Sequence, residues 1–212
     1  MPSPSDYLQT VDLPECKHFL AAMRQSKLVM HVHPLETEET KREVHELIRP
    51  CVEGFYGRDD FDLSVLLGGA AYFAVTLEDA EGAAEPARNV AGCMLGYWHA
   101  SPTNTVEIRF EATRSADDSC LLLHAMKWAV LYMAEYDPFI KANLAAPAYG
   151  GAVTVRACLS TDDSPAVWTA DMLYADRFSD AGPQSGDDEE LVLEKDLSLV
   201  AMPRCGVQTE AK

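Results

Sequence analysis

The segment VEIRFEATRSADDSCLLLHAM, residues 106–126, joins a strand-like run to an apolar helical run through a short polar turn. A turn that leads from a strand into a helix can hold a phosphate, because the free N–H groups and the dipole at a helix N-terminus favour anions. This turn, however, contains no glycine and carries Asp117 and Asp118, whose charges repel phosphate. The segment therefore has the form of a phosphate-binding turn with the wrong charge for that ligand.

Other patterns that could do chemistry are incomplete. His31 and His33 alternate on a strand-like run and could form half of a metal site, but no third ligand lies at a useful spacing. No serine lies in a G-x-S-x-G context, and the LLGGAA segment, residues 66–71, lacks the lysine of a P-loop. We therefore expect no metal site, no hydrolase nucleophile and no P-loop.

The charge of the chain limits its partners. Of the 212 residues, 17 are Lys or Arg and 34 are Asp or Glu, which gives a formal net charge of −17 with neutral histidines. A chain this acidic repels nucleic-acid backbones and anionic membranes, so we expect neither as a partner. A cationic substrate fits the charge, although an acidic solvated surface is the plainer explanation.

The cysteines and the N-terminus indicate a reducing compartment. The six cysteines are widely spaced and form no C-x-x-C pair, and Cys93 and Cys120 lie in apolar runs, so we expect buried, reduced thiols. The first residues, MPSPSDYLQTVDLPE, lack the basic and apolar regions of a secretory signal. No apolar run approaches the roughly 18 residues of a membrane span. These features predict a cytoplasmic protein.

Hydrophobic periodicity predicts an α+β fold. We expect an irregular segment at 1–13 and helices at 14–25, from Thr37 to Gly54 or Gly57, at 117–136 and at 165–178. Strands are expected at 27–35, 70–78, 89–100, 104–113, 152–159 and 191–199. Antiparallel strands in the first half, with helices inserted late, favour a mixed and mostly antiparallel sheet flanked by helices.

The order of these elements resembles the GNAT-type N-acetyltransferase superfamily. VEIRFEAT is similar to the family's central splayed strand, and Arg114–Ser119 has the spacing of its Q/R-x-x-G-x-G/A turn. ADMLYADRF is similar to the family's A-x-x-L-Y-x-K-x-G-F helix end, and EELVLEKDL to its closing strand. The resemblance covers 27–199, which we expect to form one GNAT-like domain between an extension with a short helix, 1–26, and a tail, 200–212.

The resemblance implies a site for acetyl-CoA or another acyl-CoA. It assigns cofactor contacts to the strand residues Phe110 and Ala112 and to the turn residues Arg114, Ser115, Ala116, Asp117, Asp118 and Ser119. It also makes Glu107 the general base for an amine and Tyr174 the acid for the leaving thiolate. On the residues alone, Glu107 could equally pair with a basic neighbour such as Arg109, and Tyr174 could be a core residue.

Two departures from the family pattern leave a second function open. Asp117 and Ser119 stand where the turn glycines are expected, and the YADRF segment is one residue too short for the Gly-Phe pair. Asp117 could instead cap its own helix and fill the anion site with a carboxylate. The resemblance therefore implies an N-acetyltransferase acting on a polyamine, a Lys-rich peptide or a small amine. The alternative is a non-catalytic binding or regulatory protein of the same fold.

Overall fold

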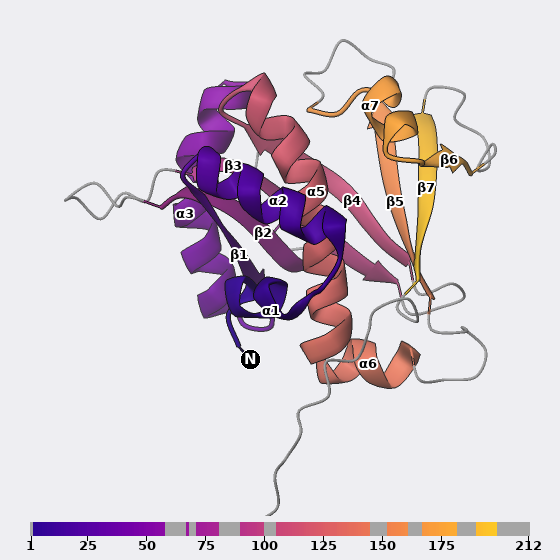
Figure 1. The fold of residues 1–212 in the computed structure, drawn as a ribbon. Helices are drawn as coiled ribbons and strands as arrows, with labels where there is room; N and C mark the ends of the chain where they lie inside the picture. Colours follow the sequence, from indigo (N-terminus) through magenta and orange to yellow (C-terminus); the bar gives the residue numbers. More distant parts are fainter. Residues whose placement is uncertain are drawn as a thin grey trace, which may run out of the picture.

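A computed structural model describes residues 2–57, 67, 71–80, 90–99, 105–144, 152–160, 167–181 and 190–198. These residues form one seven-stranded sheet with helices on both of its faces (Figure 1). No helix within these ranges is both long enough and apolar enough to cross a membrane.

The sheet is mixed and mostly antiparallel, as the sequence predicts. Its strands lie in the order β1-β2-β3-β4-β5-β7-β6. Their bounds are Leu28–Pro34 (β1), Ala71–Asp79 (β2), Val90–His99 (β3), Thr105–Thr113 (β4), Ala152–Ser160 (β5), Ser179–Asp180 (β6) and Glu190–Ser198 (β7). Every neighbouring pair is antiparallel except β4 and β5, which run parallel. The predicted fold class is confirmed.

Helices cover the two faces of the sheet unequally. On one face lie α1 (Pro4–Thr10), α2 (Pro14–Gln25) and the long α5 (Ala116–Tyr136), and on the other lies α3 (Glu38–Tyr56) (Figure 1). Two short helices complete the described chain, α6 (Pro138–Leu144) and α7 (Ala170–Ala175). Each face buries its own apolar cluster, and the larger one lies under α1, α2 and α5. This arrangement brings the N-terminal extension into the main core.

A bulge in β4 changes which residues face each helix layer. Leu95 of β3 is opposite Phe110 and Gly96 is opposite Ile108, so Arg109 has no partner on β3. One extra residue reverses the alternation of side chains along a strand. Accordingly, Ile108 packs in the cluster under α5, whereas Phe110 packs in the cluster under α3.

Three local expectations from the sequence are wrong. The start of the chain is helical at α1, because Ser3 caps it, Pro4 suits its first turn, and Tyr7 and Leu8 are buried. Cys120 is exposed, because it lies on the outer side of α5.

The third concerns the helix expected at 165–178, which forms only as α7. Thr169 caps its first turn by accepting a hydrogen bond from the backbone N–H of Met172, and Arg177 ends it with a positive φ of 67°.

Candidate functional site

The parallel strands β4 and β5 separate along their length. They pair from Thr105 with Thr154 to Ile108 with Ala157, and the second half of β4 has no partner on β5. The second half of β4 leads directly into the turn before α5. The structure thus places the predicted strand and turn residues at the opening between the two strands, as the resemblance implies.

The helix N-terminus at this opening is capped by the chain itself. Ser115, and not Asp117, is the N-cap, and its Oγ accepts a hydrogen bond from the backbone N–H of Asp118 at 3.3 Å. The same hydroxyl donates to Oδ2 of Asp118 at 2.7 Å. This exchange resembles a capping box with aspartate in its third position. The expectation that Asp117 caps the helix is therefore wrong: Ser115 caps it, and the carboxylate of Asp118 lies beside the cap.

Arg114 is also held by carboxylates of the chain. Its two terminal nitrogens donate to the carboxylate of Asp79, at the end of β2, at 3.0 and 3.3 Å. Its Nε lies 3.8 Å from Oδ2 of Asp118. The hydrogen bond to Asp79 raises the pKa of the Arg114 guanidinium. A phosphate at this turn would have to compete with both acids for Arg114.

The remaining turn residues divide between solvent and core. Ala116 and Asp117 are exposed at the first turn of α5. Ser119 is buried, its hydroxyl donates to the carbonyl of Ala116 at 2.5 Å, and its carbonyl accepts from the indole of Trp168 at 3.2 Å. The side chain of Ser119 therefore points inward, and its backbone carbonyl holds the loop before α7 through Trp168.

The predicted strand contacts, Phe110 and Ala112, are buried under α3. The Phe110 ring stacks on Tyr56 with ring centroids 5.7 Å apart. The Tyr56 hydroxyl donates to the backbone carbonyl of Glu111 at 2.7 Å. The side chains of Phe110 and Ala112 cannot reach the α5 side of the opening, so a cofactor there could contact only the backbone groups of these two residues.

Glu111 is a candidate that the sequence does not reveal. It lies on the half of β4 that has no partner on β5, opposite Met94 of β3, which belongs to the cluster under α5. Its side chain is half-buried, and no described residue donates a hydrogen bond to its carboxylate. Burial raises the pKa of this carboxyl to about 7. A carboxyl with a pKa near neutrality suits a general base.

Glu107, the predicted base, lies on the opposite face of β4. It is 9% exposed, it is opposite Tyr97 of the cluster under α3, and its backbone is level with Arg156 of β5. Arg156 donates to Oε1 of Glu194 at 2.7 Å. The two carboxylates of β4, Glu107 and Glu111, are thus separated by the sheet.

Tyr174, the predicted acid, lies on the surface of α7 and is 44% exposed. Its hydroxyl donates to Oδ1 of Asp180 at 2.5 Å, and this hydrogen bond raises its pKa. In this arrangement the phenol is turned toward β6. Its assignment as a thiolate acid remains a prediction.

The histidines of β1 take part in the sheet. Nε2 of His33 lies 3.0 Å from Oγ1 of Thr76 on β2 and 3.8 Å from Oε1 of Glu78. Within the described ranges, no three His, Cys, Asp or Glu side chains are grouped as metal ligands.

Comparison with known proteins gives similarity in three dimensions only. No protein-family model matches the chain, and no curated protein matches its sequence. Among solved structures, an N-acetyltransferase from Staphylococcus aureus Mu50 is 10% identical, with 79% of this chain and 97% of the other covered and a TM-score of 0.44. A putative GNAT-family acetyltransferase from Desulfovibrio desulfuricans is 12% identical over 81% and 99%, with a TM-score of 0.46.

A spermidine/spermine N-acetyltransferase from Vibrio cholerae, in mutant forms, is 11% identical over 82% of this chain and 95% of the other, with a TM-score of 0.39. Among the described residues, the strand order and the parallel pair of β4 with β5 agree with the GNAT-type fold that the sequence resembles.

Proposed function

We propose that the protein is an acyl-CoA-dependent N-acyltransferase whose cofactor lies in the opening between β4 and β5. The observation that carries this proposal is the separation of the two parallel strands after Ile108 and Ala157. An unpaired strand edge offers N–H and C=O groups to an extended molecule, as in peptide binding by strand addition. The amide-containing arm of coenzyme A is such a molecule.

The chemistry requires a group that removes a proton from the amine. The acceptor nitrogen loses its ammonium proton and attacks the thioester carbonyl, and the tetrahedral intermediate then releases the thiolate, which takes up a proton. Glu111 lies on the half of β4 that has no partner on β5, and burial raises its pKa to about 7, which supports it as the base. Glu107 remains the base that the resemblance implies. The face on which the amine binds decides between the two.

The charge of the chain supports a cationic acceptor. A formal net charge of −17 concentrates polyamines and lysine-rich peptides near the surface and raises their rate of encounter. We therefore propose an amine of this kind as the acceptor.

One observation favours a second function, a non-catalytic protein of this fold. The anion site at the start of α5 is satisfied by Ser115 and Asp118, and Arg114 is engaged by Asp79. A carboxylate within about 4–6 Å of a phosphate costs on the order of 1 kcal/mol or more. If this cost exceeds the binding free energy that the strand edge of β4 contributes, the protein does not bind acyl-CoA and acts by binding another partner.

Transfer of a labelled acetyl group from acetyl-CoA to spermidine and to a lysine-rich peptide tests the proposal. We expect time-dependent labelling of at least one acceptor, with a rate that rises between pH 6 and pH 8 as the base loses its proton. Absence of labelling, with intact folded protein and saturating acetyl-CoA, would refute transfer to either amine. If acetyl-CoA still bound in that case, the proposed cofactor site would stand, and only spermidine and the lysine-rich peptide would be excluded as acceptors.

A further inference from the structure

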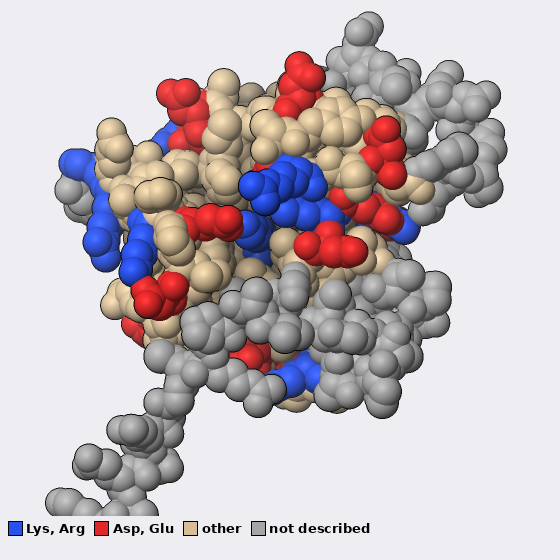
Figure 2. All heavy atoms as spheres, turned by 45° about the vertical axis from the view of Figure 1, so that its right-hand side comes forward, with Lys and Arg blue, Asp and Glu red and all other residues tan. Residues whose placement is uncertain are grey.

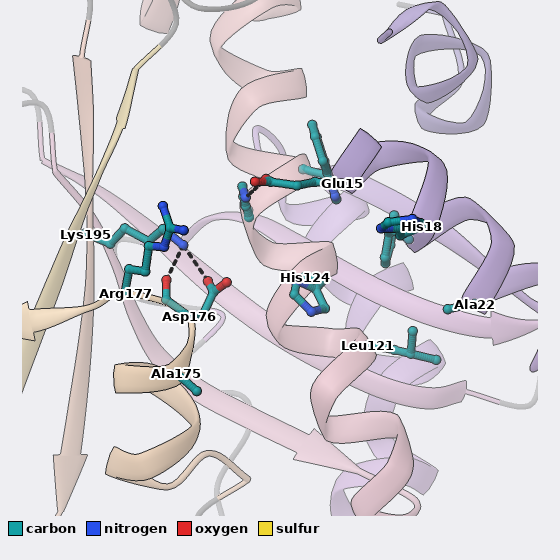
Figure 3. A pocket seen from close by; sticks show the side chains of 12 residues that line it. Glu15, His18, Ala22, Leu121, His124, Ala175, Asp176, Arg177 and Lys195 are labelled. Carbon is teal, nitrogen blue, oxygen red and sulfur yellow. Dashed lines mark hydrogen bonds and ion pairs between the residues drawn. The ribbon is translucent and has the colours of Figure 1, made fainter. Parts of the chain in front are cut away.

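A pocket lies away from the β4–β5 opening, between α2, α5, β7 and the turn after α7. Its volume is about 470 Å³, within the range typical of small-molecule sites. Figure 3 shows Asp176, Arg177 and Lys195 on one side of α5, and Glu15 and His18 of α2 on the other. Phe19, Leu121 and Trp128 supply apolar surface to its walls.

This pocket is distinct from the proposed cofactor site. Lys195 is opposite Val155 of β5, which is opposite Val106 in the paired half of β4. The pocket is therefore level with the closed part of the two strands. None of the turn residues 114–119 lines it, and α2, which forms one wall, belongs to the N-terminal extension.

The pocket concentrates positive charge on an acidic protein. Lys127, Arg177 and Lys195 line it together with only two acids, Glu15 and Asp176. Lys127 pairs with Glu15 at 2.6 Å, and Lys195 pairs with Asp176 at 2.6 Å. Arg177 forms no ion pair within 4 Å among the described residues, although its charge acts on Glu15 across the pocket. With its histidines neutral, the lining has a net charge of +1, whereas the whole chain has −17. One face of the molecule shows Lys and Arg side chains gathered near its middle, bordered by acids (Figure 2).

Arg177 occupies a backbone position that favours glycine. At the end of α7, the N–H of Phe178 bonds to the carbonyl of Leu173, and the N–H of Arg177 bonds to the carbonyl of Tyr174, each at 3.0 Å. This is a Schellman motif, whose residue with positive φ is usually glycine. Arg177 adopts φ 67° there. Strained residues of this kind concentrate at ligand sites.

We propose that this pocket binds a small organic anion, a phosphate or carboxylate on a compact apolar body, with Arg177 as its main charged contact. The two lysines are already neutralised by their acids, so the guanidinium is the group left to meet a ligand. Arginine also binds phosphate and carboxylate through two parallel hydrogen bonds. The apolar walls accept the remainder of the ligand. The site would serve a molecule other than the acyl donor and does not depend on the proposed transferase activity.

Calorimetric titration with phenyl phosphate tests this site, with Arg177→Gly as the variant. We expect saturable binding to the native protein and a loss of affinity of about fivefold or more in the variant, because a charge-assisted hydrogen bond is removed. The same substitution relieves the positive φ, so the urea midpoint should rise. Weaker binding by a more stable protein cannot be attributed to unfolding.

Lys27→Gly is the matched control. Lys27 is the other non-glycine residue with positive φ in the described chain, at 55°, and it does not line the pocket. The Lys27→Gly variant should be stabilised in the same way and keep the native affinity for phenyl phosphate. Equal affinity in the native protein and Arg177→Gly, or no saturable binding to the native protein, would overturn the proposal. Loss of phenyl phosphate binding at saturating acetyl-CoA would overturn its separation from the cofactor site.

Discussion

Replacing Glu111 with glutamine should stabilise the protein at high pH and not at low pH. Burial raises the pKa of this carboxyl from 4.5 to about 7, so the folded protein binds the proton more tightly than the unfolded chain. Below about pH 4.5 both states are protonated and the carboxyl carries no penalty. As the pH rises from 4.5 toward 7, the carboxyl loses its proton in the unfolded chain first, so the free energy of unfolding falls. Above pH 7 the folded protein carries the full cost of the buried carboxylate.

The size of the effect follows from the same two values. A difference of about 2.5 in pKa corresponds to at most about 3–4 kcal/mol, and the partial exposure of the side chain reduces this to about 1–3 kcal/mol. We expect the free energy of unfolding of Glu111→Gln, relative to the native protein, to increase by this amount between pH 4.5 and pH 8.

Urea unfolding at several pH values between 4.5 and 8 measures this difference. The slopes of free energy against urea should be the same for both proteins, so that the midpoints can be compared directly. Glu39→Gln, which changes an exposed carboxylate in the first turn of α3, is the control and should show a much smaller dependence on pH. A difference between Glu111→Gln and the native protein that is constant over the whole range would refute the buried-carboxyl argument.

Three further predictions concern β4, β3 and the turn before α5. Asp118→Asn should tighten coenzyme A binding several-fold, because it removes a carboxylate at the phosphate position. The gain should be smaller at high salt, and calorimetry at two salt concentrations measures it. Unchanged affinity would show that Asp118 does not oppose the phosphates. Glu107→Gln should lower the acetyl transfer rate 10²–10⁴-fold with little change in cofactor affinity if Glu107 is the base, and an unaltered pH–rate profile would assign it a structural role. Gly96→Ala should destabilise the protein by about 1–3 kcal/mol in urea unfolding, because the new Cβ would lie 2.3 Å from Cζ of the fully buried Phe73. Gly92→Ala is the control and should cost less, because its Cβ would lie 3.4 Å from the side chain of Thr113. Equal effects of the two substitutions would contradict this packing.

The elements that form the sheet could be predicted because their apolar patterns are local. The strands expected at 104–113 and 152–159 are β4 and β5 within one residue, and the helix expected at 117–136 is α5. The helix α1 was missed because proline, serine and aspartate are common both in loops and in first turns of helices. The burial that selects the helix comes from contacts of Tyr7 and Leu8 with distant parts of the chain.

The site could be predicted in outline and not in detail. The sequence places Arg114, Ser115 and Asp118 in one turn, and the structure brings them together. It does not reveal Asp79, which comes from another strand, or the bulge at Arg109 that turns Glu111 toward the α5 side. Neither follows from local patterns, because both depend on how β4 pairs with its neighbours. The role of Arg177 likewise depends on a backbone angle that composition does not indicate.

Calorimetric titration of the native protein with acetyl-CoA shows whether the opening between β4 and β5 is a cofactor site. We expect saturable binding with one site per chain, tightened by Asp118→Asn and unaffected by Arg177→Gly. Absence of binding to both the native protein and Asp118→Asn would contradict this expectation and would favour a non-catalytic protein of the same fold.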